Sequence, residues 1–343
     1  MAGGGIVSHG SQNKKGGLKA LLAALLALFA LSLSGCRDVS QKDSWIVQAV
    51  LEAPGETVRL GLLCRSVGPG ESEEKWSLFT ARAEDEGKAL DEIQQQAGGK
   101  FYFGHCEYLL LEGNAGREGI RRASAFWRKP ERGCGNLRVY EYQAGAALLE
   151  KEDTDWQALT AGLSRLEEEG SYRAYAYRLS SQDSPALVPL LAWEGEKGLL
   201  TCQGLDFYRE GDTEPRLWEG NLAALAALLD GQTHSVVWQG EGGSRIQLEP
   251  ALITYRIQGG KDWSLSLSLD AFVRLKTGEE RRAGELEAQV QKELEELISQ
   301  TWAPGADVFG FGQRFGFADS RRAAGEGRDL YSRQVSAGLL LWE

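Results

Sequence analysis

The sequence predicts a multi-domain protein of the α/β to α+β class, in which mixed sheets are flanked by helices. Three observations support this prediction: helical and strand patterns alternate over residues 84–169, period-two strands follow residue 235, and a long amphipathic helix comes after them. The chain of 343 residues is also too long for one comfortable core. We therefore expect two or three domains.

The start of the chain has the features of a secretory signal. Lys14, Lys15 and Lys19 precede an apolar run over residues 20–33, in which Ser32 is the one polar side chain. This run is shorter than the roughly 20 apolar residues that a membrane-spanning helix needs. Residues 1–35 are therefore predicted to be a signal peptide, and no later segment has the length and hydropathy to cross a membrane.

Leu33-Ser34-Gly35-Cys36 ends this run and resembles a bacterial lipobox. In that class of signal, the cysteine thiol is joined to a diacylglyceryl group and the cysteine becomes the N-acylated mature N-terminus. Two or more acyl chains, such as palmitate, hold a protein stably on a membrane. We therefore expect a lipoprotein with a lipid on Cys36, a tether over residues 36–43 and no other cofactor. The alternative is an ordinary secretory signal with a cysteine there by chance.

The chain after the expected cleavage site is acidic. It carries 35 basic and 49 acidic residues, so its net charge is −14. Such a charge does not favour binding to nucleic acid or to anionic lipid headgroups. The acyl chains are therefore expected to provide the membrane attachment.

The first domain is predicted to cover residues 44–180. Apolar runs at residues 44–51 and 57–63, separated by a Pro-Gly turn, indicate a β-hairpin, and residues 64–76 are expected to form a loop. A helix is expected over residues 84–97, because Gly98-Gly99 ends its apolar stripe.

A strand, a helix, a strand and a helix are expected to follow in the same domain. Residues 106–111 are continuously apolar, as in a strand buried on both faces. A helix over residues 114–127 is stopped by Pro130, residues 137–142 alternate as a strand, and residues 144–169 are strongly helical.

A small middle domain is predicted over residues 181–233. Residues 180–197 contain two prolines and look like a connector, followed by a strand at 199–208 and a helix at 221–229. A C-terminal α+β domain is predicted over residues 234–317, and residues 318–343 are expected to be a tail without an assigned role. The elements expected in that last domain are strands at 235–239, 245–258 and 263–275 and an amphipathic helix at 284–302.

Four cysteines follow Cys36, namely Cys64, Cys106, Cys134 and Cys202. Four thiols in an exported protein can form two disulfides. They are far apart in the sequence and lie mostly among apolar neighbours, where a free cysteine behaves as a small hydrophobe. Buried thiols are therefore favoured over disulfides, and no Cys or His spacing is typical of a metal site.

Residues 101–129 resemble the characteristic stretch of the C subunit of spore germinant receptors, the Ger(x)C lipoproteins. That stretch combines a turn, an apolar strand and a helix that leads into an aromatic and basic end. The matching positions are Phe103-Gly104-His105, residues 109–111, Arg117-Glu118-Gly119-Ile120 and residues 126–128.

Two further stretches are similar to the same family. Asp307-Val308-Phe309-Gly310-Phe311-Gly312, after the long helix, is similar to the signature Asp-Ile-Phe-Gly-Phe-Gly. Residues 202–208 are a weaker match, with Leu205-Asp206 where the family has Ala-Val. The segment after Cys36 also lacks the usual start, and the chain beyond Phe317 has no counterpart. The chain is identified as a divergent member because the lipobox and the three stretches occur in family order.

The resemblance implies a three-domain, non-enzymatic subunit of a nutrient-germinant receptor, needed for the germination response of spores. It implies a location on the outer face of the inner spore membrane and two membrane proteins, the A and B subunits, as partners. Germinant recognition is attributed to those partners, so direct binding of a small molecule is not expected. The residues that it marks as structural or partner contacts are Gly104, His105, Gly119, Asp307, Phe309, Gly310, Phe311 and Gly312.

Several motifs permit two interpretations. His105 suits a pH sensor or a base, but a residue that fixes a turn is favoured because no nucleophile or second histidine is near in the sequence. The glycines around Phe311 follow a helix, which argues against a phosphate loop. Core packing there is favoured over a partner contact.

Two charged segments also leave alternatives open. Residues 150–155 lack the spacing and the glycine of a calcium loop, so a solvated helix start is favoured. Arg121-Arg122 and residues 128–132 form a basic cluster. It is either a solvated helix end or a contact to headgroups or to an acidic partner loop.

Two other functions compete with the receptor subunit. An extracytoplasmic solute-binding lipoprotein of a transporter would show two similar lobes of repeated βα units, which the pattern lacks. A cell-envelope hydrolase is disfavoured because the sequence contains no recognisable nucleophile or metal constellation.

Overall fold

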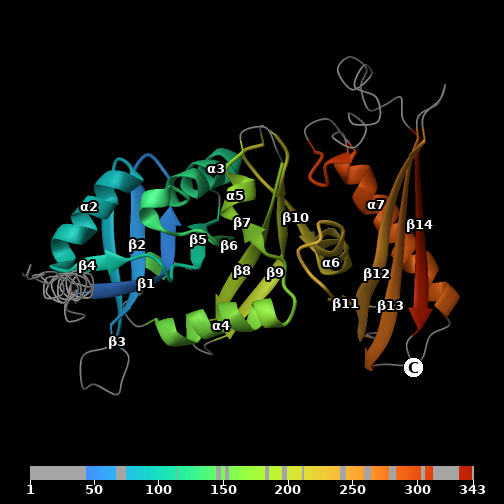
Figure 1. Ribbon diagram of the computed structural model, residues 1–343, viewed down its shortest axis with the longest axis horizontal. Helices are drawn as coiled ribbons and strands as arrows, with labels where there is room; N and C mark the ends of the chain where they lie inside the picture. Colours follow the sequence, from blue (N-terminus) through green and yellow to red (C-terminus); the bar gives the residue numbers. More distant parts are fainter. Residues whose placement is uncertain are drawn as a thin grey trace, which may run out of the picture. The chain divides into compact units, whose positions relative to one another are not determined.

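The computed structural model has a mixed α/β fold with two sheets, both flanked by helices (Figure 1). The expected fold class is therefore confirmed. Residues 44–343 form one compact unit. The structure describes residues 44–66, 75–113, 115–143, 148–150, 154–181, 185–194, 199–210, 212–239, 245–258, 264–277, 283–302, 306–311 and 332–341. The expected signal peptide, Cys36 and the tether lie outside the described residues.

The larger sheet has ten strands, with the order β10-β9-β8-β6-β5-β1-β2-β3 and with β4 beside β1 and β7 beside β6. β1, β5, β6 and β8 are parallel neighbours, whereas β2, β3, β9 and β10 run antiparallel to their neighbours. Its strands are β1 (Ser44–Ala53), β2 (Val58–Ser66), β3 (Lys75–Ala83), β4 (Lys100–Tyr102), β5 (Tyr108–Glu112), β6 (Arg138–Tyr142), β7 (Ala174–Tyr175), β8 (Ala186–Glu194), β9 (Leu199–Tyr208) and β10 (Arg216–Glu219).

Helices cover both faces of this sheet. On one face, Ile93 and Trp127 pack with the sheet residues Val50, Leu109 and Val139, and on the other face α4 packs with a separate cluster. Figure 1 shows α2 and α3 on one side of the strands and α4 on the other. The helices are α2 (Glu86–Ala97), α3 (Gly116–Trp127), α4 (Trp156–Glu168) and the short α5 (Ala176–Leu179), with 3-10 turns η2 (Pro130–Arg132) and η3 (Leu148–Glu150).

The smaller sheet has the order β11-β12-β13-β14. Leu248, Leu269 and Val273 on its inner face pack with Val290 and Leu294 in the same core cluster. Its elements are α6 (Gly220–Leu229), β11 (Val236–Gln239), β12 (Arg245–Gln258), β13 (Ser264–Thr277), α7 (Ala283–Thr301) and β14 (Ser332–Leu341).

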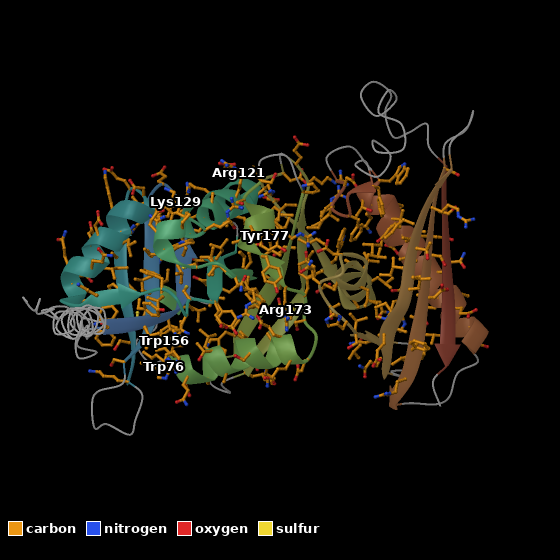
Figure 2. The ribbon with its side chains drawn as sticks, in the orientation of Figure 1. Trp76, Arg121, Lys129, Trp156, Arg173 and Tyr177 are labelled. Carbon is orange, nitrogen blue, oxygen red and sulfur yellow. The ribbon has the colours of Figure 1, made fainter. Side chains whose placement is uncertain are left out.

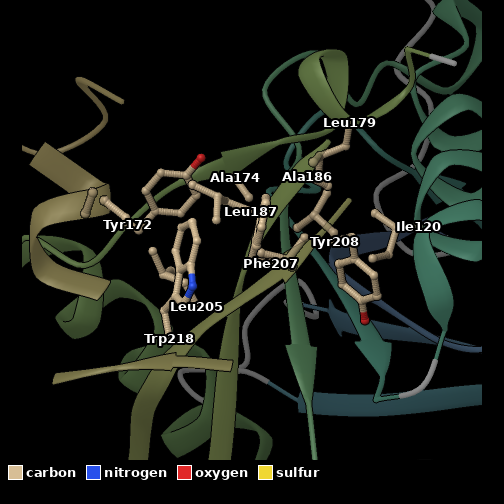
Figure 3. Packing of buried hydrophobic residues seen from close by; sticks show 14 of the residues in the cluster. Ile120, Tyr172, Ala174, Leu179, Ala186, Leu187, Leu205, Phe207, Tyr208 and Trp218 are labelled. Atoms are coloured by element: carbon tan, nitrogen blue, oxygen red, sulfur yellow. The ribbon is translucent and has the colours of Figure 1, made fainter. Parts of the chain in front are cut away.

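The core continues along the larger sheet toward α6. Phe207 of β9 stacks on Trp218 of β10 with ring centroids 4.4 Å apart, and Leu205 and Tyr172 lie in the same cluster (Figure 3). Within the described residues, no helix combines the length and the hydropathy that a membrane crossing requires.

The structure confirms most of the expected elements and corrects four. The expected loop at 64–76 is wrong at both ends, because residues 64–66 extend β2 and residues 75–76 begin β3. The expected helix at 144–169 begins only at Trp156, where Asp155 caps it by accepting a 2.9 Å hydrogen bond from the amide of Ala158. Asp155 therefore supports the helix-start interpretation of residues 150–155.

The expected connector at 180–197 is wrong, because residues 186–194 form β8. Leu187, Val188 and Leu191 are almost completely buried, and this burial outweighs the amide donor that Pro189 lacks. β8 pairs with β6, so the expected domain boundary at residues 180–181 falls inside one sheet.

The expected tail at 318–343 contains a strand. β14 pairs with β13 in parallel over ten residue pairs, from Ser264 opposite Ser332 to Val273 opposite Leu341. The paired residues are 68 positions apart in the sequence, and such long-range pairs leave no mark in the local pattern.

Candidate functional site

The turn at Phe103–His105 connects β4 to β5. It is closed by a 2.9 Å hydrogen bond from the amide of Cys106 to the carbonyl of Phe103. His105 is exposed, with its ring centroid 5.8 Å from that of Tyr102. A Cβ on Gly104 would lie 2.5 Å from the Tyr102 hydroxyl, so the glycine lets this ring fold over the turn. The geometry supports the turn interpretation of His105.

α3 carries the second part of the first motif, and the motif residues on it make internal contacts. Arg117 donates to the carbonyls of Leu179 and Ser181, at 3.0 and 2.9 Å, and so ties α3 to the end of α5. Gly119 faces Pro54 of the β1–β2 turn at ordinary contact distance, and Ile120 is fully buried. This motif therefore joins α3 to the sheet and to α5.

A buried carboxyl lies under the end of α3. The indole N–H of Trp127 donates to Glu52 Oε2 at 3.0 Å, and both side chains are 0 % exposed. Burial raises the pKa of Glu52 to about 7, and the nearby Glu86 carboxylate adds to the shift. Glu86 itself accepts a 2.8 Å hydrogen bond from Arg122, so Arg122 is neutralised at this position.

A second buried acidic cluster lies between β6 and β9. The Tyr208 hydroxyl lies 2.8 and 2.9 Å from the two carboxylate oxygens of Glu141, and Asp206 hydrogen-bonds Glu141 across β8. Burial raises the pKa of Glu141, and the charge of Asp206 raises it further; burial also raises the pKa of Asp206. Sequence reasoning did not single out this cluster, although Asp206 marked a departure from the family pattern.

The Asp307–Phe311 segment forms a tight turn after α7. Asp307 Oδ1 accepts a 2.7 Å hydrogen bond from the amide of Phe311, and Gly310 has a φ of 71°, in the left-handed region that favours glycine. Phe311 is fully buried, with its ring 6.2 Å from Trp302 and 6.0 Å from Tyr255. Core packing is confirmed for Phe309 and Phe311, whereas Gly312 lies outside the described residues.

The four cysteines in the described residues are free thiols. Cys64, Cys106 and Cys134 are buried, as expected, and Cys202 is half-buried. Burial raises the pKa of the Cys64 thiol and raises that of Cys202 to about 11, so both favour the neutral form at pH 7.

The basic cluster expected from the sequence separates into paired and exposed cations. Arg121 pairs with Glu118 one turn earlier, and Arg122 pairs with Glu86. Arg128 is exposed and donates to the Tyr177 carbonyl at 3.4 Å, and Lys129 lies 5.5 Å from the Phe126 ring centroid. The arginines of the first half are therefore paired with glutamates, whereas Arg128 and Lys129 of the second half are exposed and contact a carbonyl and a ring face.

Two clefts lie near the junction of the sheets. One of about 900 Å³ is bounded by the end of α4, by β9 and by α6 and β11, with Arg165, Glu169 and Gln247 among its polar groups. The other, of about 980 Å³, separates β10 and α6 from α7 and is rich in glutamate. Across the described residues, no group of three or more His, Cys, Asp and Glu side chains is placed to hold a metal ion.

Comparison with known proteins gives one structural likeness to report. A solved structure described as "Crystal Structure of the GerBC protein" is similar to this chain with a TM-score of 0.44 and 10% sequence identity. The match covers 83% of this chain and 94% of that chain. No family model and no curated protein matches the sequence.

Proposed function

We propose that the chain is the lipid-anchored C subunit of a spore nutrient-germinant receptor, on the outer face of the inner spore membrane. It would act without catalysis, by supporting receptor assembly and coupling to the A and B membrane subunits. The observation that carries the proposal is the order of motifs: a lipobox at Cys36, the stretch at 101–129, the weaker match at 202–208 and the segment at 307–312.

The contacts of the two stronger motifs agree with such a role. Arg117 joins α3 to the end of α5, Trp127 joins α3 to β1 through Glu52, and Phe311 is fully buried in the core. Residues that maintain a rigid body are suited to a subunit whose task is to dock and to transmit. Because these motif residues are buried, contacts with the A and B subunits would be made by other residues, on the surface of the protein.

The proposed anchor can be tested directly. Cells that sporulate in the presence of labelled palmitate should incorporate the label into the wild-type chain, and the chain should fractionate with membranes. Cys36→Ala should lose both the label and the membrane fraction, whereas Cys202→Ala should keep both. Label that persists in Cys36→Ala would contradict the anchor.

The receptor assignment needs a second readout. A tagged chain solubilised from spore membranes with a mild detergent should copurify with two multi-span membrane proteins. Copurification with an ATP-driven permease would instead favour a solute-binding lipoprotein. The cleft of about 900 Å³ favours that alternative in one respect, since clefts of this size hold small molecules.

A further inference from the structure

One edge of the larger sheet collects exposed cations and aromatic rings. The parallel strands β1, β5 and β6 all run away from this edge. Lys100 of β4 lies opposite Ser44, at the start of β1, whereas β5 and β6 begin at Tyr108 and Arg138, opposite Ala49 and five residues further along β1. The turn after β4, the end of α3 and the start of α5 lie at the same edge. We call the exposed residues of this edge, Lys100, Tyr102, Arg128, Lys129 and Tyr177, the amino edge.

Contacts between rings join β4 and the turn after it to the end of α3. Phe101 and Phe103 lie with ring centroids 6.4 Å apart, Phe103 lies 5.9 Å from Trp127, and Trp127 lies 5.0 Å from Phe126. The Phe126 ring supports the guanidinium of Arg132 at 3.7 Å and the ammonium of Lys129 at 5.5 Å. The β4 turn is thus packed against the basic end of α3.

Tyr177 extends the amino edge on the other side of α3. The Ala176 amide donates to the Leu137 carbonyl, which fixes the start of α5 beside the start of β6. The Tyr177 ring stacks on Tyr175 and its carbonyl accepts from Arg128. Figure 2 labels Lys129 at the end of α3 and Tyr177 on the neighbouring α5.

The charge of the amino edge is opposite to that of the chain. Two carboxylates at this edge, Glu107 and Glu131, are already next to Arg138 and Arg132. Among the described residues, the Arg128 side chain contacts the Tyr177 carbonyl, and the Lys129 ammonium lies over the Phe126 ring. Net positive charge therefore remains at the edge of a protein whose expected mature charge is −14.

The aromatic content of the amino edge is also distinctive. Tyr102 and Tyr177 are 56% and 52% exposed, and no other aromatic side chain among the described residues reaches these values. Exposed tyrosine beside lysine and arginine is the side-chain combination found at membrane interfaces, where the ring sits at headgroup level and the cation meets phosphate.

A lipid on Cys36 would keep this edge near the membrane. Seven residues lie between Cys36 and Ser44, and an extended chain spans at most about 28 Å over the eight steps from one to the other. Ser44, the first described residue after the expected tether, is paired with Lys100. We propose that the amino edge is a docking surface for anionic phospholipid headgroups, which orients the tethered body on the membrane. This inference rests on the proposed lipid anchor.

Vesicle flotation of an unlipidated chain tests the proposal. The protein is the chain from residue 36 with Cys36→Ser, and the vesicles contain either phosphatidylglycerol or phosphatidylcholine. We expect binding to phosphatidylglycerol vesicles alone at about 0.1 M salt, and its loss at about 1 M salt, where the Debye length is about 3 Å.

Two triple variants separate the local charge from the net charge. Lys100→Glu/Arg128→Glu/Lys129→Glu should lower the vesicle partition coefficient at least about tenfold, because each cation near an anionic surface contributes to binding. Arg216→Glu/Arg256→Glu/Lys292→Glu makes the same charge change at exposed positions elsewhere and should leave binding within about twofold. Circular dichroism checks that both variants are folded.

Two outcomes would overturn the inference: no binding of the wild-type body to phosphatidylglycerol vesicles, or equal loss in the two variants. A body that does not bind vesicles, but whose receptor assembly is lost in the amino-edge variant, would show a protein partner instead. Acylation of Cys36 is measured separately, so failure of the anchor and failure of the docking surface are distinguishable.

Discussion

Glu141, Asp206 and Tyr208 bring two carboxyls and a phenol into the interior of the larger sheet. Burial raises the pKa of Glu141 above its value in the unfolded chain, and Glu52 shifts in the same direction, to about 7. Between the unfolded and folded pKa values, the native state binds more protons than the unfolded state. The free energy of unfolding therefore falls as the pH rises through that interval.

Glu141→Gln is expected to reduce this pH dependence. The amide imitates the protonated carboxyl, still accepts from Tyr208 and cannot ionise. Urea unfolding at about pH 5 and about pH 8 should show that the wild type loses on the order of 1–3 kcal/mol across this range and that the variant loses less. Glu92→Gln, at an exposed position, serves as the control. An unchanged pH dependence in Glu141→Gln would contradict the assignment.

Trp127→Phe is expected to lower the free energy of unfolding by about 1–3 kcal/mol, because the buried Glu52 loses its 3.0 Å donor. The loss should be larger near pH 8 than near pH 5, where Glu52 is protonated. Trp193→Phe is the matched control, since its buried indole N–H has no partner among the described residues. Equal effects at both positions would show that lost ring volume, not the hydrogen bond, dominates.

For individual residues, the sequence identifies those that belong to motifs. It does not identify polar residues whose importance comes from being buried in the folded protein. Gly119 and Phe311 were identified because they belong to recognisable stretches. The alternation over residues 137–142 predicts a strand but gives no sign that Glu141 is buried, because the burial of both faces follows from α3 and α4 covering the sheet. The pairing of Asp206 with Glu141 crosses β8, a strand that the sequence pattern did not reveal.

Among the elements, the turn after α7 has a clear energetic role. Phe311→Ala is expected to lower the free energy of unfolding by about 3–5 kcal/mol, because the ring is fully buried against Trp302 and Tyr255. Phe272→Ala, at a position that is 38% exposed, is the control and should cost less than about 1 kcal/mol. A small effect at Phe311 would revive the partner-contact interpretation.

β14 is expected to protect β13 through backbone hydrogen bonds. A chain that ends at residue 331 removes this pairing over its ten residue pairs. Hydrogen exchange of the amides of residues 264–273 should become faster, whereas exchange in β5 and β6 should be unchanged. Unchanged protection of β13 would contradict the pairing.

The elements that the sequence predicted correctly have strong local signals. α2 has an apolar stripe and a glycine in the left-handed conformation at its end, and β12 and β13 alternate over long runs. The elements that were missed depend on distant partners. β3 is a half-exposed edge strand, β8 contains Pro189, and β14 is recruited by β13.

On the scale of the whole molecule, two surface regions differ in charge. The amino edge of the larger sheet is basic and aromatic, whereas the cleft beside α7 is lined by several glutamates. The fold class followed from the alternation of elements, but the continuity of the larger sheet across residue 180 did not. The anchor at Cys36 remains a prediction from the sequence.

Nutrient-triggered release of dipicolinate from spores tests the central claim most directly. Spores that lack the gene are complemented with the wild type or with Cys36→Ala, and each is exposed to a panel of amino acids and sugars. The account predicts that deletion spores fail to respond to at least one nutrient, that the wild type restores release and that Cys36→Ala restores it only in part. A normal response of the deletion spores to every nutrient, in a strain without other germinant receptors, would contradict the account.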